Sequence, residues 1–457
     1  MNKLHESPTK LEELLNINYM DIITAVRDAS PKSIISAAEK IRSSAFSKER
    51  WLFHNIYHND VIATLQAEGD NPPSRPNQLA QYIAASTVLH CSDGWKFFSC
   101  AMENLLNGDK SNTVFMAYYA QLRSLMAFFA TQGIGIFNNK HYCYDNNGTC
   151  SHFWKNTHDA VRELINAWAI DNGKNISLLQ ILKLEGRSYS DWISGADILL
   201  GSPRIPELAK DWLTAWSIDL NVLGKDHETR NEVSYRPQGI IHKPNVYRSR
   251  SDLDLCIKTW RLSEPYSANR FAMLDQQLLR ETLFTIYKHR KPTRIKFTQF
   301  VETSMINLGL GLDSELHRFL ISSQTNSNNE ILRIARKPAS TKARGIDPIP
   351  VMCRAFLLLR IASAAVENFL EASSIDSSDL EFWWSQFGIQ NGLWEPEHSP
   401  SQMSDLWADI SDAIDNVDSF LEQNTSRIDI ARSHSELSYE LWQLKHFDKA
   451  GLWAIGL

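Results

Sequence analysis

The sequence predicts a mainly α-helical protein, a multi-helix assembly with one small β-hairpin inserted near residues 136–153. Three observations support this class. Apolar residues recur at three- and four-residue steps along most of the 457 residues. Strands and helices do not alternate in the way that builds a parallel sheet. The turn-forming residues Asp145 to Gly148 lie between two short segments with strand character.

Two apolar helices joined by a polar turn form the predicted core. From Trp95 to Leu106 the apolar side chains share one helical face, with Ser92 as the N-cap and Gly108 just beyond the end. A second helix over 113–130 is apolar or aromatic on nearly every face, so most of its surface must be buried. Because the connection is short, the two helices are expected to be antiparallel neighbours.

Further helices are expected on both sides of this pair. Ser30 and Pro31 predict a helix start, with serine as N-cap and proline at the first helical position. The other expected helices cover 10–15, 20–29, 49–67, 154–169, 207–220, 270–289, 297–308, 351–371, 380–387, 401–423 and 427–446.

The Pro-rich segment 69–77 predicts a boundary after the first helices. We therefore expect three units: an N-terminal helical unit over 1–68, a central helical domain with the hairpin over 77–250, and a C-terminal helical domain over 251–457.

Composition narrows the class of protein. A formal net charge of −6 argues against a generally basic surface for nucleic acid, although local basic patches remain open. Six scattered cysteines are too few for a disulfide scaffold. The first residues lack the apolar core of a secretory signal, and no apolar run is expected to span a membrane. The expectation is a soluble, cytoplasmic protein without a membrane partner.

The hairpin carries a potential metal site. His141, Cys143, Cys150 and His152 follow the pattern H-x-C, six residues, C-x-H. If Asp145 to Gly148 form the loop, Cys143 faces Cys150 and His141 faces His152. All four side chains then share one face and offer tetrahedral ligation to zinc. The alternative is a hairpin whose cysteines are small hydrophobes and whose histidines lie at the surface. The sequence identifies no other cofactor.

Two further features are candidates for function. Arg123 is the single charge in the middle of the 113–130 helix, so it is either a structural ion pair or a site residue. The stretch 225–252 is polar, basic and interrupted by Pro237, Gly239 and Pro244. It predicts an irregular segment, which is either a loop facing a phosphate or nucleotide or an ordinary solvated connection.

The familiar catalytic motifs are missing from the sequence. It contains no GxxxxGK[ST], GxGxxG after a strand, HExxH, GxSxG, EF-hand loop or CxxC.

Two segments carry a family resemblance: AYYAQLRSLMAFFATQGIGIFNNKHY and HETRNEVSYRP. Their pairing resembles bacterial helical proteins of the YaaC-like and HEPN-like kind, many of them associated with phage defence or toxin systems, over about residues 85–245. The resemblance implies metal-independent RNA cleavage through an Arg-x4-6-His motif near a dimer interface. In that motif the arginine holds the scissile phosphate and the histidine acts on the 2′-hydroxyl.

The closest match to that motif runs from Arg236 to His242, with five residues between them. It departs from the family pattern because Pro237 and Gly239 disfavour the helix on which the motif belongs. Arg230 and Asn231 have the usual arginine-polar start but no histidine at the required distance.

Two principal hypotheses follow. The first is an anti-phage defence protein of HEPN-like character that cleaves RNA without metal or responds to a nucleotide, as a homodimer or with protein partners. Its catalytic residues would be Arg236, His242 and Arg230, and its substrate-binding residues Asn231, Arg123 and Tyr235.

The second hypothesis is a non-enzymatic helical scaffold or regulatory subunit of a multi-protein defence or DNA-processing complex. Its contacts would be the basic connector 335–350 and the apolar tail 451–457, which must dock on its own domain or on a partner. A zinc-stabilised binding module is a third reading, and it depends wholly on the hairpin.

Overall fold

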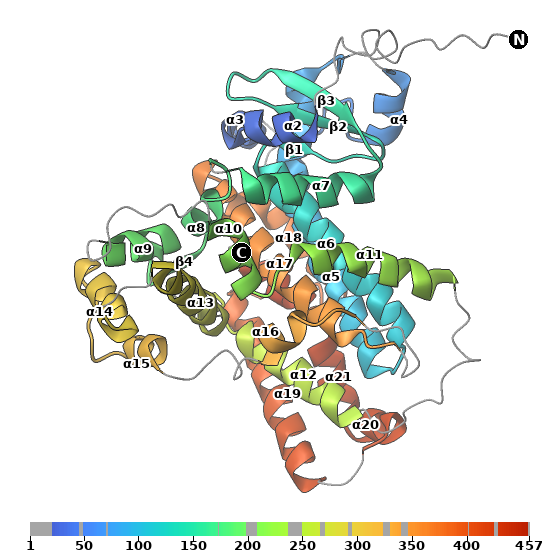
Figure 1. Cartoon of the computed structure of the whole chain (residues 1–457). Helices are drawn as coiled ribbons and strands as arrows, with labels where there is room; N and C mark the ends of the chain where they lie inside the picture. The colour runs from blue at the N-terminus through green and yellow to red at the C-terminus, as the bar shows by residue number, and fades with distance from the viewer. Residues whose placement is uncertain are drawn as a thin grey trace, which may run out of the picture.

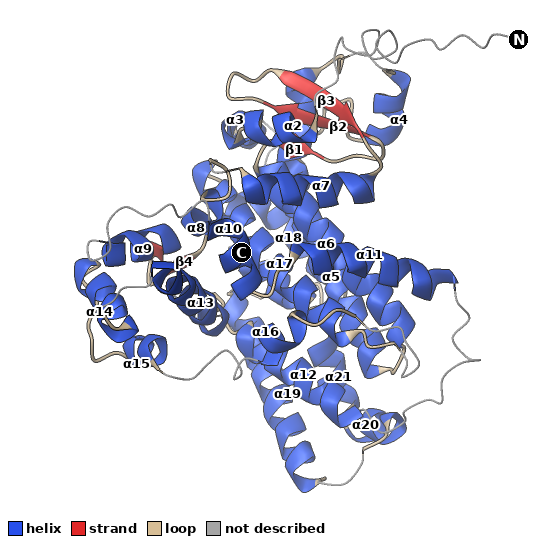
Figure 2. Cartoon of the chain, viewed as in Figure 1, coloured by secondary structure: helices blue, strands red, loops and turns tan. Residues whose placement is uncertain are grey.

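The computed structural model describes residues 21–44, 49–69, 72–171, 173–197, 208–235, 249–265, 270–290, 295–322, 330–339, 346–400, 402–424 and 428–455. Helices dominate these ranges, and a three-stranded sheet lies at one end of the molecule (Figure 2). The predicted class, mainly α with a small β-hairpin insertion, is confirmed.

Three long helices form the centre: α5 (Pro76–Leu106), α6 (Lys110–Thr131) and α17 (Ile349–Ala372), each packed against the other two. Trp95 of α5 is fully buried, and its indole N–H donates to the Ser363 hydroxyl of α17 over 3.0 Å. Gly94 permits this close approach, because a Cβ there would lie 2.9 Å from a methyl group of Leu359. The antiparallel pair expected from the sequence is therefore extended by a third helix from much later in the chain.

The ends of α5 and α6 differ from the prediction. Ser92 is not an N-cap but lies inside α5, which runs without interruption from Pro76. Gly108 does follow the end of α5 with a positive φ of 78°, as predicted. The Asp109 carboxylate accepts the Asn112 backbone N–H, so α6 begins at Lys110 rather than at 113.

Helix α17 is long and apolar enough to cross a membrane by length and composition, contrary to the expectation that no segment would be. However, 94% of its most apolar window is buried inside the fold, as in the core helix of a soluble protein. Its two buried arginines are neutralised by carboxylates: Arg354 pairs with Asp226, and Arg360 pairs with Asp275 over 2.8 Å.

A three-stranded antiparallel sheet lies at one end of the molecule, above α7 in Figure 1. Its strands are β1 (Ile134–Gly135), β2 (Lys140–Tyr144) and β3 (Cys150–Trp154). Helices α2 (Ile22–Asp28), α3 (Pro31–Arg42) and α4 (Val61–Ala67) surround it, and α7 (Thr157–Ile170) follows β3. Ser30 caps α3 as predicted, whereas the helix expected over 49–67 is reduced to α4.

The prediction that residues 225–252 are irregular is wrong at both ends of this stretch, where the structure has helices. Helix α11 (Leu220–Tyr235) occupies its first part, α12 (Ser249–Leu262) begins before its end, and residues 236–248 lie outside the described residues. In α11 the buried positions are Val222, Asp226, Thr229 and Val233, at helical spacing. Two of the four are polar, which hides the helical pattern in the sequence.

The remaining elements complete two further lobes around the three long helices. One lobe contains α8 (Ser177–Ile181), β4 (Lys183–Leu184), β5 (Arg187–Ser188), α9 (Tyr189–Asp197), α10 (Ala209–Ala215), α13 (Ala272–Arg290), α14 (Phe297–Asn307) and α15 (Glu315–Ile321). The other elements are α16 (Glu330–Ala335), α18 (Ser377–Gln390), α19 (Met403–Gln423), α20 (Ile430–Glu436), α21 (Ser438–Lys445) and α22 (Asp448–Ala454).

The apolar tail docks on its own chain as far as Ile455. Helix α22 packs against α5 and α17, and the Trp453 indole N–H donates to the Ser263 carbonyl over 3.0 Å. Buried apolar side chains from α2 to α22 belong to one contiguous cluster. The domain boundaries near 69–77 and 250 stay predictions.

Candidate functional site

Helices α6, α7 and α11 pack against one another (Figure 1). Polar aromatic and basic side chains cluster where they meet. A buried ion pair fixes α11 there: the Arg354 guanidinium donates to both Asp226 oxygens, over 2.7 and 2.5 Å, and both side chains are fully buried. Gln121 of α6 adds a third donor to the same carboxylate over 3.0 Å. Asp226 therefore ties α11 to α6 and α17, and sets which side of α11 faces α7.

Arg230 is the cation of this cluster. Its guanidinium donates to the Tyr119 hydroxyl over 2.6 Å and to the Asn231 side-chain oxygen over 2.9 Å. It also lies 4.9 Å from the ring centre of Phe115 and 5.3 Å from that of Tyr119. Aromatic packing and hydrogen bonds thus hold a planar cation in one orientation, which is the preorganisation that phosphate recognition requires.

Three stacked rings lie beside Arg230. The Tyr118 hydroxyl and Nδ1 of His158 are 2.8 Å apart. The imidazoles of His158 and His227 stack with their centres 4.9 Å apart, and Tyr118 stacks on His227 at 5.5 Å. Asn231 approaches Nε2 of His227 at 3.4 Å and accepts from Arg230, so it links His227 to the arginine. His158 joins this group through ring stacking.

The surroundings keep both imidazoles neutral near pH 7. Burial, the neighbouring His227 and Arg230 lower the pKa of His158. Burial and Arg230 also lower the pKa of His227, against the opposing effect of the Asp159 carboxylate. Burial raises the pKa of the Tyr118 phenol, so that group stays protonated. A neutral imidazole can accept a proton, and the imidazolium formed in this way can return it.

The cluster is accessible to a ligand. His158, His227, Arg230 and Tyr119 are all half-buried, so each presents part of its side chain to solvent. A fixed guanidinium next to two neutral imidazoles can bind a phosphate oxygen and move protons to and from it. Phosphate binding combined with proton transfer is therefore the chemistry that this site can perform.

The structure brings some of the predicted site residues together and separates others. Arg230 and Asn231 belong to the cluster. Arg123 lies one helical turn beyond Tyr119 and is only partly buried; it is hydrogen-bonded to His90 over 2.8 Å and lies 3.7 Å from Asp93. Tyr235 ends α11 with 84% of its surface exposed. The remaining two predicted residues, Arg236 and His242, lie outside the described residues.

Tyr118, Tyr119, His158 and His227 belong to the cluster but were not predicted as site residues. His227 and Tyr118 lie inside the two segments that carry the family resemblance, one helical turn or less from residues already singled out. His158 had no such indication, because it is distant in sequence from α11 and enters the site only through the packing of α7.

The predicted zinc site depends on a strand pairing that is wrong: β2 and β3 pair with a shift of one residue from the predicted register. Cys143 pairs with Ser151, and Tyr142 pairs with His152, around a loop of five residues instead of four. His141 and Cys143 therefore point to one face of the hairpin, and Cys150 and His152 point to the other. Across the described ranges, no group of three or more His, Cys, Asp or Glu side chains is placed to hold a metal ion.

The local chemistry of the hairpin agrees with this correction. His141 uses both ring nitrogens, since Nδ1 accepts the Phe137 N–H over 3.1 Å and Nε2 lies 2.8 Å from the Lys155 carbonyl. Burial raises the pKa of the Cys143 and Cys150 thiols to about 12, which disfavours the thiolates that zinc requires.

The fold and site define a mainly α-helical protein with a half-buried histidine, tyrosine and arginine cluster at a three-helix junction. Comparisons of the chain with protein-family models, curated proteins and solved structures found no match. The function is therefore inferred from the chemistry of the cluster.

Proposed function

We propose that this chain is a cytoplasmic, HEPN-like ribonuclease of anti-phage defence that cleaves RNA without a metal ion. The observation that carries the proposal is the placement of Arg230 beside the stacked pair His158 and His227, two histidines whose pKa values are lowered. A homodimer or a complex with protein partners belongs to the same proposal, because the resemblance implies a dimer interface near the motif.

The proposed reaction is an internal transfer at phosphorus. One imidazole accepts the proton of the ribose 2′-hydroxyl, the 2′-oxygen forms a bond to phosphorus, and the bond from phosphorus to the 5′-oxygen breaks. The imidazolium formed in this way returns the proton to the leaving 5′-oxygen, so that both imidazoles are neutral again. The products are a 2′,3′-cyclic phosphate and a free 5′-hydroxyl, so atoms and charges balance without a further reactant.

Arg230 supports this step electrostatically. Negative charge builds up on the non-bridging phosphate oxygens as the 2′-oxygen attacks, and an oriented guanidinium stabilises it. Tyr118 orients His158 through its hydroxyl, and Asn231 links Arg230 to His227. The site differs from the linear Arg-x4-6-His motif, because both histidines lie outside that spacing.

The testing experiment combines RNA degradation in vitro with growth arrest on expression. Wild type is compared with His158→Gln, His227→Gln and Arg230→Met, and His398→Gln serves as the control because that histidine is 74% exposed and distant from the cluster in sequence. We expect wild type and the control to cleave RNA with EDTA present and the three cluster variants to lose at least about a hundredfold in rate. If folded wild type leaves RNA intact, alone and with its neighbouring gene products, the proposal fails and the scaffold hypothesis replaces it.

A further inference from the structure

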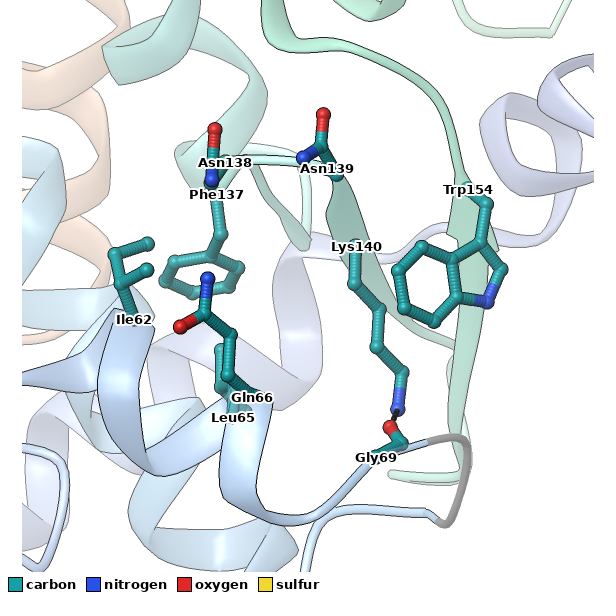
Figure 3. A pocket seen from close by; sticks show the side chains of 9 residues that line it. All are labelled: Ile62, Leu65, Gln66, Gly69, Phe137, Asn138, Asn139, Lys140 and Trp154. Atoms are coloured by element: carbon teal, nitrogen blue, oxygen red, sulfur yellow. Dashed lines mark hydrogen bonds between the residues drawn. The ribbon is translucent and has the colours of Figure 1, made fainter.

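A small cavity lies between α4 and the edge of the sheet, on the side where β2 begins and β3 ends (Figure 3). Its volume is about 160 Å³, which is small compared with drug-sized sites. Side chains from three segments line it: Gln66 of α4, Phe137 to Asn139 of the β1–β2 connection, and Trp154 at the end of β3. The cavity is separate from the residues of the histidine cluster.

The connection that forms one wall is held in place. The Thr157 hydroxyl lies within hydrogen-bond distance of the Phe137 and Asn138 carbonyls, at 2.8 and 2.6 Å. The Lys155 backbone N–H donates to the Asn139 carbonyl over 2.9 Å. The Phe137 N–H donates to Nδ1 of the buried His141 over 3.1 Å. The backbone of this wall is therefore preformed, and a ligand would not need to order it.

Three primary amides line the cavity. The side chains of Gln66, Asn138 and Asn139 are exposed, and their amide groups make no hydrogen bond to any residue within the described ranges. Each amide offers a donor and an acceptor side by side. Such a set matches a ligand edge that itself alternates donors and acceptors, as the edges of nucleobases do.

A lysine and two aromatic rings also line the cavity, together with Ile62, Leu65 and Gly69. Lys140 is only 6% exposed; its ammonium donates to the Gly69 carbonyl over 2.6 Å and lies 5.7 Å from the centre of the Trp154 ring. Figure 3 shows Lys140 between Phe137 and Trp154. The fixed positive charge of Lys140 disfavours cationic ligands. The two aromatic rings favour a flat ligand.

We propose that this cavity binds a single nucleobase, either of a mononucleotide or of an unpaired position in RNA. The volume admits one ring system. The rings of Phe137 and Trp154 can stack on a base, and the side-chain amides can hydrogen-bond to the edge of that base. Trp154 precedes His158 by four residues, so their Cα atoms lie within roughly 14 Å of each other. An RNA chain could therefore reach from this cavity to the cluster. This second role, as a base subsite of the ribonuclease, rests on the proposed function, whereas mononucleotide binding does not.

The first test is binding of AMP, GMP, CMP and UMP to the full chain, measured by saturation-transfer NMR with ribose 5-phosphate as the probe without a base. We expect at least one mononucleotide to bind and ribose 5-phosphate not to bind. The double variant Gln66→Ala and Asn138→Ala should bind at least tenfold more weakly, whereas Gln390→Ala, an exposed amide of α18, should behave as wild type. Absence of binding by all four mononucleotides, or equal binding by the double variant, would overturn the proposal.

The second test separates a free nucleotide from a base in a chain. Anisotropy of a labelled 2′-O-methyl oligonucleotide reports RNA binding without cleavage, because the attacking hydroxyl is blocked. Tighter binding of the oligonucleotide than of the mononucleotide, weakened tenfold by the double variant and also by Arg230→Met, supports a base subsite connected to the cluster. If mononucleotides bind but the double variant leaves oligonucleotide binding unchanged, the cavity is a nucleotide site alone and the base subsite is rejected. Failure of cleavage with intact mononucleotide binding would count against the ribonuclease only.

Discussion

The guanidinium of Arg230 donates a hydrogen bond to the phenolic oxygen of Tyr119 over 2.6 Å, although the two residues are 111 positions apart in the sequence. This contact joins α11 to α6 and brings together the two segments that carry the family resemblance. Each segment is unremarkable alone, since a YYA helix packs a core and a HETRN helix faces solvent on one side. Their meeting fixes the cation next to His227, and α7 adds His158.

Arg230→Lys tests whether the planar guanidinium matters beyond its charge. We expect the affinity for a 2′-O-methyl oligonucleotide to fall about tenfold. Lysine keeps the charge but loses the packing on Phe115 and Tyr119 and the planar set of N–H donors of the guanidinium. The measurement is anisotropy titration at fixed ionic strength. Lys225→Ala, an exposed residue on the same helix, should change affinity much less. Equal affinity for Arg230→Lys and wild type would show that Arg230 is only a surface charge.

The rate of RNA cleavage should depend on pH through the lowered histidine pKa values. Both imidazoles have a folded-state pKa below 6.5, so the neutral form is present at pH 7 and is lost as the pH falls through the folded value. We expect kcat/KM to decline as the pH falls below 6.5, as the proton-accepting imidazole becomes charged. An acidic limb centred above pH 7 would contradict these assignments.

The buried pair of Asp226 and Arg354 should be costly to break on one side. Arg354→Met leaves an uncompensated carboxylate in the core, and we expect the free energy of unfolding to fall by about 3–5 kcal/mol. Combining it with Asp226→Leu should recover part of that loss, because the isolated charge is removed. Urea unfolding measures both. The exposed pair of Lys183 and Glu371 provides the control, since Lys183→Met should cost about 1 kcal/mol or less.

His141 should make the stability of the hairpin region sensitive to acid. Burial lowers its pKa from 6.5 to about 4, and the side chain is fully buried. Its contribution is therefore complete above pH 6.5 and is lost as the pH falls toward 4. Between pH 7.5 and 4.5, wild type should lose about 2 kcal/mol more stability than His141→Gln. Parallel pH profiles for the two proteins in urea unfolding would exclude this role.

Much of the fold was predictable because local patterns and burial agreed. The apolar helix over 113–130, the cap at Ser30 and the glycine at 108 all follow rules of spacing and backbone conformation, and the structure has all three. The hairpin was also predictable, but its register was not. Asp145 bonds the N–H groups of Asn147 and Thr149, which adds a fifth loop residue and moves Cys150 and His152 to the other face.

The site was harder to predict than the fold. Helix α11 was mistaken for a loop because Asp226 and Thr229 occupy buried positions, where a carboxylate is stable only through Arg354, 128 positions later. His158 reaches the cluster through tertiary packing alone. No spacing rule links it to His227, so the sequence singles out Arg230 of this cluster but not the two histidines beside it.

The measurement that most directly tests the central claim is cleavage of a short RNA that contains one 2′-deoxynucleotide at a mapped cleavage position, with EDTA present. The proposed site requires the 2′-hydroxyl as the attacking group, so cleavage should stop at that position alone and continue elsewhere with 2′,3′-cyclic phosphate ends. The same pattern should vanish at all positions in His158→Gln and His227→Gln. Continued cleavage at the 2′-deoxy position, or products with 5′-phosphate ends, would contradict catalysis by the histidine pair.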